Sequence, residues 1–396
     1  MRVCIRRGAA EVGGSCVEVE ADGRRLVLDA GLPLEPAEVP MRDLLPDVPG
    51  LWARGDGSLL ALLISHGHPD HCGLADLVAP GVRVLAGAAT VRIAEEAAFF
   101  GGASRALAAE GRFRSGQAFE IGPFSIRPVV VDHSAFDAYA LVIEAGGRRL
   151  VYSGDLRAHG RKPGTMSRFA CAARGADPWS ERDVELRIAE VCRENEGIVL
   201  TAAAAQNVDR LVSLFRAARQ AGRELVLDLY AASVLAATRH PSVPTAHWDG
   251  VRVFLPASQR HRVIEAEAFD RPARVRQARI YPDELRASPE RFLMLFRSSM
   301  ARDLERADCL DGAVLVWSLW TGYLDRDERL RAFRGAHQLP MHIAHASGHA
   351  HPNDLRALVV ASRAEAVVPI HTDDPEACRA LGPNVTPRPD GEWWEV

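Results

Sequence analysis

The chain of 396 residues has almost no lysine: Lys162 is the only one, so nearly all of its positive charge is arginine. Its basic and acidic residues nearly balance, to a formal net charge of -4, which excludes a strongly basic protein that coats nucleic acid nonspecifically. It also lacks an apolar signal core at its start and any apolar run approaching about 18 residues. We therefore expect neither export nor a membrane-spanning segment.

Paired cysteine motifs are absent as well. The seven cysteines are odd in number, widely spread and nowhere spaced as CxxC. This pattern favours reduced thiols in a cytoplasmic protein. The chain shows no internal repeat and no low-complexity linker, and its length predicts two or three domains or one large elaborated domain.

Apolar periodicity predicts strands in the first part of the chain. Residues 15–20 alternate with period two, and a turn at Asp22 and Gly23 connects them to the apolar residues of 24–31, as in a hairpin. Residues 59–65 (LLALLIS) form a continuous apolar run of strand length. The sequence therefore predicts a sheet whose strands end in loops, where functional sites often lie.

From about position 181 the period changes, and helices alternate with strands. Residues 207–222 place their apolar positions on one helical face and end at a glycine, and 223–230 (RELVLDLY) follow as a strand. The alternation continues through 312–318, which predicts a parallel sheet covered on both faces and therefore a second domain. Further strands are expected at 364–374 (AEAVVPIHTDD) and 391–396 (GEWWEV).

Residues 65–73 (SHGHPDHCG) carry three histidines and an aspartate within six positions. Such side chains are costly to bury unless they are paired or bind a cation. Three more groups of the same kind follow predicted strands further along the chain. The seven candidates are His66, His68, Asp70, His71, His133, Asp155 and His371. Imidazoles and carboxylates are a ligand set for Zn²⁺ or Mn²⁺, so the sequence predicts a metal site.

The motif HGHPDH resembles the HxHxDH signature of the metallo-β-lactamase superfamily. Asp29 in LDAG, His133, Asp155 in SGD, and His371 match the other motifs of that family in the same chain order. The long stretch after SGD, followed by HASGHA and PIHTD, is similar to the β-CASP branch, whose members include ribonuclease J. The resemblance implies an α/β fold, with a metallo-β-lactamase αββα sandwich and an inserted α/β β-CASP domain.

The resemblance also implies three segments. Residues 1–195 would form the N-terminal part of the metallo-β-lactamase domain, 196–338 the β-CASP-like insertion, and 339–396 the C-terminal return to the first domain. Two divalent metal ions are expected as cofactors, Zn²⁺ first and Mn²⁺ as the alternative.

The resemblance gives each matching residue a role. One metal would be bound by His66, His68 and His133, and the second by Asp70, His71 and His371, with Asp155 bridging them. Asp29 would orient a ligand or the loop through hydrogen bonds. Asp70 and His349 would act in catalysis, with His349 stabilising the transition state or protonating the leaving oxygen. Ser347 and His345 would bind phosphate, although a supporting or packing role is the alternative for His345.

One expected feature of the β-CASP pattern is missing from this sequence. That pattern places an acidic residue at the end of a strand shortly after Asp155, yet residues 156–180 contain no apolar strand and no recognisable acidic motif. If that residue orients a histidine that binds metal or donates a proton, its loss would cut activity by roughly 10- to 100-fold.

Other groups near predicted strand ends of the insertion could contact a substrate. They are Arg297, Ser298, Ser299 and Ser318 for backbone phosphates, and Trp317 or Trp320 for stacking on a base. For the tryptophans, the alternating apolar pattern favours packing in the core.

The expected function is a metal-dependent phosphodiester hydrolase, a ribonuclease acting as a 5′ exonuclease or an endonuclease through a hydroxide that bridges two metal ions. The expected partner is RNA, with single-stranded DNA as a second candidate; no membrane is involved, and a homodimer is a family-level expectation. Two alternatives stay open. One is a hydrolase of a small ester, thioester or lactam, and the other is a degenerate, non-catalytic homologue that binds RNA or protein.

Overall fold

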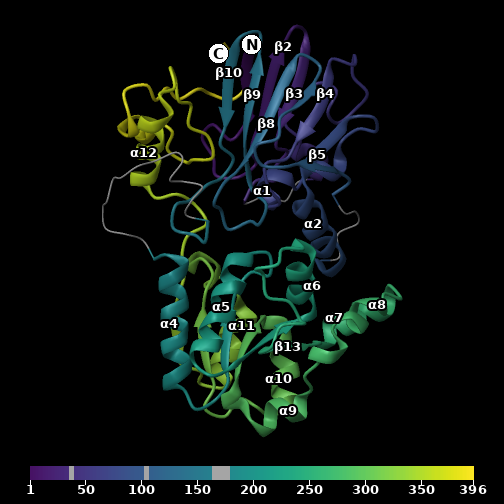
Figure 1. The fold of residues 1–396 in the computed structure, drawn as a ribbon, viewed down its shortest axis with the longest axis vertical. Coiled ribbons are helices and arrows are strands. Elements are labelled where there is room, and N and C mark those ends of the chain that lie inside the picture. Colours follow the sequence, from purple (N-terminus) through teal and green to yellow (C-terminus); the bar gives the residue numbers. More distant parts are fainter. Residues whose placement is uncertain (35–39, 102–106, 163–178) are drawn as a thin grey trace.

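The computed structural model describes residues 1–34, 40–101, 107–162 and 179–396, and these residues form three β-sheets (Figure 1). Two sheets lie together in the upper part of Figure 1, and the third lies below them among its own helices. Residues 163–178, which make up most of the stretch where an acidic strand end was expected, lie outside the described residues.

The first sheet is built from both ends of the chain. Its strands are β1 (Arg2–Arg7), β2 (Cys16–Ala21), β3 (Arg24–Leu28), β4 (Leu59–Leu63), β5 (Arg83–Gly87), β6 (Glu110–Phe113) and β17 (Trp393–Glu395), in the order β17-β1-β2-β3-β4-β5-β6. The second sheet contains β7 (Phe119–Ile121), β8 (Phe124–Val130), β9 (Tyr139–Ala145) and β10 (Arg148–Tyr152), in the order β10-β9-β8-β7.

The predicted hairpin between β2 and β3 is confirmed. The two strands pair antiparallel, and the turn residues Asp22 and Gly23 have φ angles of 50° and 69°. Both lie in the left-handed region that a two-residue hairpin turn requires. Strand β4 then pairs parallel to β3, so that the two strands end at the same edge of the sheet.

Apolar side chains from both sheets meet in one core, which includes Val19, Leu26 and Leu63 from the first sheet and Phe124 and Ile143 from the second. Helices α1 (Pro69–Cys72) and α2 (Ala88–Gly101) follow strands of the first sheet, and α12 (Pro352–Ser362) packs against the outer face of the second. Figure 1 shows α2 and α12 on opposite sides of the two sheets. The predicted αββα sandwich is therefore confirmed.

The third sheet is parallel, as predicted for the second half of the chain, and it has six strands in the described residues. They are β11 (Val199–Ala202), β12 (Glu224–Asp228), β13 (Val251–Phe254), β14 (Phe292–Phe296), β15 (Val314–Trp317) and β16 (Met341–Ile343), in the order β13-β12-β14-β11-β15-β16.

Helices accompany these strands. They are α4 (Glu181–Glu194), α5 (Val208–Gln220), α6 (Leu229–Thr238), α7 (Ala257–Glu265), α8 (Asp270–Arg274), α9 (Pro282–Ala287), α10 (Ala301–Ala307) and α11 (Glu328–Ala336). Short 3-10 helices are η1 (Met41–Leu44), η2 (Ala75–Leu77), η3 (Arg276–Ala278), η4 (Pro289–Arg291), η5 (Ser298–Met300), η6 (Thr321–Tyr323) and η7 (Ala377–Leu381).

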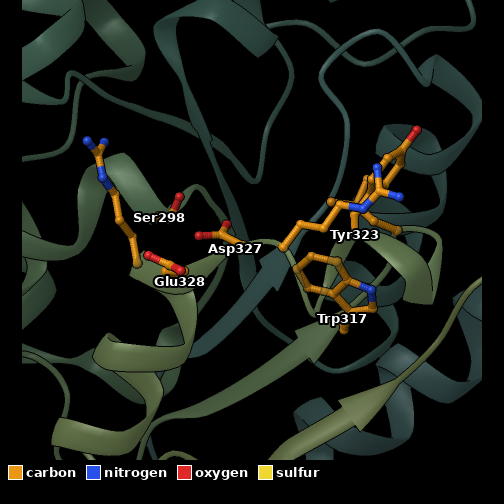
Figure 2. A pocket seen from close by; sticks show the side chains of 8 residues that line it. Ser298, Trp317, Tyr323, Asp327 and Glu328 are labelled. Carbon is orange, nitrogen blue, oxygen red and sulfur yellow. The ribbon is translucent and has the colours of Figure 1, made fainter. Parts of the chain in front are cut away.

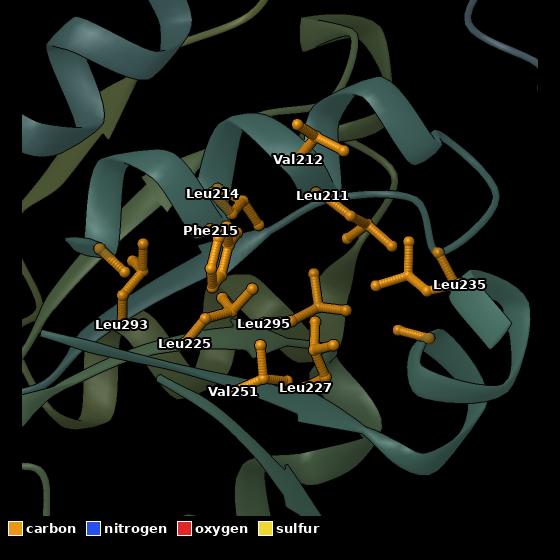
Figure 3. Packing of buried hydrophobic residues seen from close by; sticks show 14 of the residues in the cluster. Leu211, Val212, Leu214, Phe215, Leu225, Leu227, Leu235, Val251, Leu293 and Leu295 are labelled. Carbon is orange, nitrogen blue, oxygen red and sulfur yellow. The ribbon is translucent and has the colours of Figure 1, made fainter. Parts of the chain in front are cut away.

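Side chains of the third sheet alternate between two cores. Leu225 and Leu227 of β12 face one core, and Val226 faces the other. Figure 3 shows the first of these cores, where Leu211 and Phe215 of α5 lie over the sheet. The period of two along the strands and the helical period of α5 explain why both elements were predicted.

The segment 364–374 differs from its predicted strand. Among the described residues, its β pairing is limited to an isolated bridge between Val367 and Val385. Pro369 has no backbone N–H and so cannot extend a ladder here. The predicted closing strand is confirmed as β17, which pairs with β1.

No helix in the described ranges combines the length and the apolar character needed to cross a bilayer.

Candidate metal centre

The predicted ligands lie on loops that follow strands of the first two sheets. The loop after β4 carries His66 to His71, and α1 begins within it. His133 follows β8, and Asp155 follows β10. His371 comes from the C-terminal return, where its backbone N–H donates to the Gly8 carbonyl at 2.7 Å.

The structure brings the seven residues together as two neighbouring groups. In each group, one potential ligand atom per residue lies within 4.8 Å of the others. The first group contains His66, His68 and His133, and the second contains Asp70, His71, Asp155 and His371.

Asp155 belongs to the second group and also faces the first. Its Oδ1 is 3.4 Å from Nε2 of His71, and its Oδ2 is 3.8 Å from Nε2 of His371. The same Oδ2 is 3.8 Å from Nε2 of His133 in the first group. The carboxylate therefore faces potential ligands of both groups.

The donor set fits divalent cations. Nε2 of His66 and Nε2 of His371 are buried and have no hydrogen-bond partner among the described residues. Burial lowers the pKa of His66 and His133 well below its usual range, and lowers that of His68 to about 4. These imidazoles are therefore neutral near pH 7, which is the form that binds metal.

His71 behaves in the opposite way. Burial lowers its pKa, but the nearby carboxylates of Asp155 and Asp29 outweigh burial and raise it well above the usual range. Burial also raises the pKa of Asp155, yet the opposing charge of His71 dominates and holds it well below its usual range. The field that attracts a proton to this position would equally attract a cation.

Asp29 supports the ligand loop. Its Oδ1 accepts the Ser65 N–H at 2.6 Å, and its Oδ2 accepts the hydroxyls of Ser65 and Tyr152, both at 2.7 Å. Oδ2 also lies 2.8 Å from Nδ1 of His71, which leaves Nε2 of that ring toward Asp155. The carboxylate thereby fixes the orientation of a potential ligand, the kind of contact that ligating histidines commonly make.

Two residues of the site adopt left-handed backbone conformations. Asp29 and His371 each have a φ of 60°. Such conformations are uncommon for residues other than glycine and persist where the surrounding structure enforces them, often at functional sites.

His349 reaches the ligands from the loop before α12. Its Nε2 lies 3.1 Å from Oδ2 of Asp155, while its side chain stays 55% exposed. The hydrogen bond to Asp155 raises the pKa of His349 above its usual value. The ring therefore faces both the Asp155 carboxylate and solvent.

Ser347 and His345 lie on the same loop and differ in their contacts. The Ser347 hydroxyl oxygen accepts the His349 N–H at 3.1 Å, which leaves the hydroxyl hydrogen available to a ligand. Nδ1 of His345 lies 3.4 Å from the Ser318 carbonyl, and burial lowers its pKa to about 4. This geometry favours the supporting role for His345.

Buried charged residues that the sequence did not single out hold this loop in place. Arg210 donates to both carboxylate oxygens of Glu181, at 3.0 and 3.1 Å, and to the Ala346 carbonyl at 3.1 Å. Arg157 donates to the Ser347 carbonyl at 3.2 Å and to Glu181 at 3.4 Å. Both arginines are fully buried. Their only sequence signal is proximity to SGD and to the face of a predicted helix.

The groups considered for substrate contact on the third sheet differ in their exposure and contacts. Trp317 is 2% exposed and packs in the core, as the alternating pattern favoured, whereas Trp320 is 55% exposed. Ser318 is buried and bonds to Arg210 and to the Ala344 carbonyl, so it does not reach a substrate. Arg297 and Ser299 line a cavity at the sheet edge.

Comparisons with known proteins agree with this architecture. Ribonuclease J of Sinorhizobium meliloti is 31% identical over 225 residues, and ribonuclease J of Mycobacterium tuberculosis is 29% identical over 250 residues. These alignments cover 51% and 57% of this chain but only 39% and 44% of the relatives. The chain thus spans less than half the length of these curated relatives.

A crystal structure of a protein of unknown function from Enterococcus faecalis V583 shares the fold. The two align with a TM-score of 0.76 and 19% identity, over 99% of each chain. Residues 9–192 match the family model of the metallo-beta-lactamase superfamily. The similarity to ribonuclease J supports the resemblance to the β-CASP branch, and the region 9–192 belongs to the metallo-beta-lactamase superfamily.

Proposed function

We propose that this protein is a metal-dependent phosphodiester hydrolase that cleaves RNA. The observation that carries the proposal is the position of Asp155 between two groups of potential ligands, each drawn together within 4.8 Å. The family match supports a metal-dependent hydrolase, and the relatives named ribonuclease J support RNA as the substrate.

The ligand roles follow from the two groups. His66, His68 and His133 would hold one cation, and Asp70, His71 and His371 a second, with Asp155 shared. Divalent cations bound there, Zn²⁺ or Mn²⁺, would lower the pKa of a water and offset charge on a phosphodiester. Asp29 would keep the His71 ring oriented toward Asp155.

His349 would act on the leaving group. Its ring is within hydrogen-bond distance of Asp155 and half-exposed, so a bound phosphodiester could contact it from solvent. In this position the imidazole would donate a hydrogen bond or a proton to the leaving oxygen. The Ser347 hydroxyl, next to it on the loop, would donate to a phosphate oxygen.

RNA labelled at either end tests the proposal. We expect the protein with Mn²⁺ or Zn²⁺ to degrade 5′-monophosphorylated RNA, and His68→Ala to abolish the reaction. Mononucleotide products would indicate a 5′ exonuclease and internal fragments an endonuclease, while a DNA strand of the same sequence tests discrimination. Full activity in His68→Ala would refute the assigned site.

The same preparation separates the two alternatives. Turnover of a thioester or a chromogenic β-lactam without cleavage of RNA would favour a small-substrate hydrolase. A metal content below about one ion per chain, with no ester hydrolysed, would favour a non-catalytic homologue. Homodimerisation and a cytoplasmic location stay predictions, which light scattering and cell fractionation test.

A further inference from the structure

A cavity of about 260 Å³ lies where the first domain meets the third sheet. Phe100 and Gly101 at the end of α2 form one wall. The other wall comes from the carboxyl edge of the parallel sheet. Tyr230 lies there in the first turn of α6, Ser258 in the first turn of α7, and Arg297 directly after β14. In open parallel sheets, this edge is where ligands bind.

Arg297 supplies a partly buried positive charge with unused donor capacity. Its Nε donates to Oδ2 of Asp228 at 2.5 Å, and that carboxylate also accepts the Ala231 N–H and the Gln259 side chain, at 2.7 and 2.8 Å. Nη2 of Arg297 is buried, and none of the described residues accepts its hydrogen bond. An anion in the cavity would satisfy a donor that is otherwise costly to bury.

Four other lining residues supply further donors. Ser258 and Ser299 bring exposed hydroxyls, and Arg262 brings a second guanidinium, whose Nε is held by the Phe99 carbonyl at 2.8 Å. The phenol oxygen of Tyr230 accepts from Gln206 at 3.1 Å, which leaves its own hydrogen to donate. Among the described residues that line the cavity there is no carboxylate.

A neighbouring hollow differs from the cavity at Arg297 in the charges of its lining residues. It lies on the other side of η5, has a volume of about 520 Å³, and is lined in part by Ser298, Tyr323, Asp327 and Glu328. Figure 2 shows Asp327 and Glu328 on the same side of this hollow as Ser298. Arg326 and Arg329 also line this hollow and balance its two carboxylates. The smaller cavity has two guanidiniums and no carboxylate among its described lining residues, so its lining carries the net positive charge that suits a phosphate.

We propose that the cavity at Arg297 binds a backbone phosphate of the RNA substrate, away from the bond that is cut. This inference rests on the proposed function. Helix α2 extends from the ligand loop to the cavity. Near the start of the helix, Thr90 would lie 3.3 Å from a Cβ at Gly67 of the ligand loop, and near its end Phe100 lines the cavity. Ten residues of helix span about 15 Å, so the bound phosphate belongs to a nucleotide other than the one cleaved.

Removing the two hydroxyls tests the proposal without disturbing the Arg297–Asp228 pair. We expect the double variant Ser258→Ala/Ser299→Ala to raise KM for RNA by about 10-fold, since each lost bond to a charged group weakens binding. Hydrolysis of bis(p-nitrophenyl) phosphate, which is too small to reach the cavity, should stay unchanged. Ser242→Ala, at an exposed residue that lines neither of the two hollows, is the matched control and should leave KM unchanged.

Salt dependence provides a second readout. Arg262→Gln should reduce the slope of log Kd for single-stranded RNA against log salt concentration by about 0.7, the value for one lost phosphate contact. An unchanged KM in the serine variant, together with an unchanged slope in Arg262→Gln, would overturn the subsite. If the wild-type protein neither binds nor cleaves RNA, the proposed function itself is refuted, and the subsite proposal, which rests on it, is refuted as well.

Discussion

Arg157 donates to the backbone carbonyl of Ser347 at 3.2 Å, across 190 positions of the chain. Arg157 lies two residues after Asp155, and Ser347 lies two residues before His349. This bond therefore joins the loop that carries Asp155 to the loop that carries His349. Glu181 of α4 accepts from Arg157 and from Arg210, and Arg210 holds the Ala346 carbonyl. The three charged residues thus connect the third sheet's helices to the loop that positions His349.

Replacing Glu181 should destabilise the protein in a pH-dependent way. Burial raises the pKa of Glu181, but the charge and hydrogen bonds of Arg210 outweigh it and lower the pKa from 4.5 to about 2. The ionised carboxylate therefore stabilises the fold above about pH 4.5, and this contribution is lost as the pH falls toward 2. We expect Glu181→Gln to cost about 3–5 kcal/mol at pH 7, and the difference from wild type to shrink in acid.

Urea unfolding between pH 7 and pH 3 measures this difference. The buried Glu185 lies on the same helix and pairs with Arg161 and Arg182; within the described part of the chain it forms no hydrogen bond or ion pair with the 344–349 loop, so it provides the control. Glu185→Gln should lose stability but keep more activity at permissive temperature than Glu181→Gln. A stability difference that does not change with pH would contradict the ionised state of Glu181.

Replacing Asp29 should weaken metal binding. Asn keeps the size of Asp29 and tolerates its φ of 60°, but it removes the charge and one acceptor oxygen. We expect Asp29→Asn to weaken metal affinity by about 10- to 100-fold, as measured by competition with a chromogenic chelator. Tyr152→Phe, which removes one of the donors to Asp29, should have a smaller effect. Equal affinity in Asp29→Asn and wild type would argue against the support role.

Replacing His349 should separate catalysis from metal binding. Because its side chain is 55% exposed and outside the two ligand groups, His349→Ala should fold and keep its metal. We expect kcat on RNA to fall by about 10²- to 10⁴-fold, the usual contribution of a proton donor. His261→Ala, at a ring that is 75% exposed on α7, should leave kcat unchanged. Loss of metal from His349→Ala would instead assign the ring to a ligand role.

Gly31 should tolerate no side chain. A Cβ at this position would lie 1.7 Å from the carbonyl oxygen of Asp70, a distance that forces the backbone of the ligand loop to move. We expect Gly31→Ala to lower both the melting temperature and the metal content. Gly335→Ala in α11 has open space around its Cβ and should be neutral or stabilising by up to about 1 kcal/mol. Wild-type metal content in Gly31→Ala would show that the loop can shift without losing the site.

The sequence predicted the elements and the ligand residues because both have local signals. Strand and helix periods were readable within each segment, and the histidine motif places four candidates within six positions. The network of Arg157, Glu181 and Arg210 had no such signal, because charged side chains are usually exposed and their pairing depends on segments far apart in the chain. The strand expected at 364–374 failed because apolar composition outweighed Pro369 in the prediction.

The metal content of the purified protein tests the central claim most directly. After dialysis against Zn²⁺ and removal of excess, elemental analysis should find about two ions per chain in the wild-type protein and fewer than one in Asp155→Ala, whose carboxylate faces both groups. A wild-type protein that binds less than one ion, or an Asp155→Ala variant that keeps the wild-type content, would contradict a shared two-metal centre.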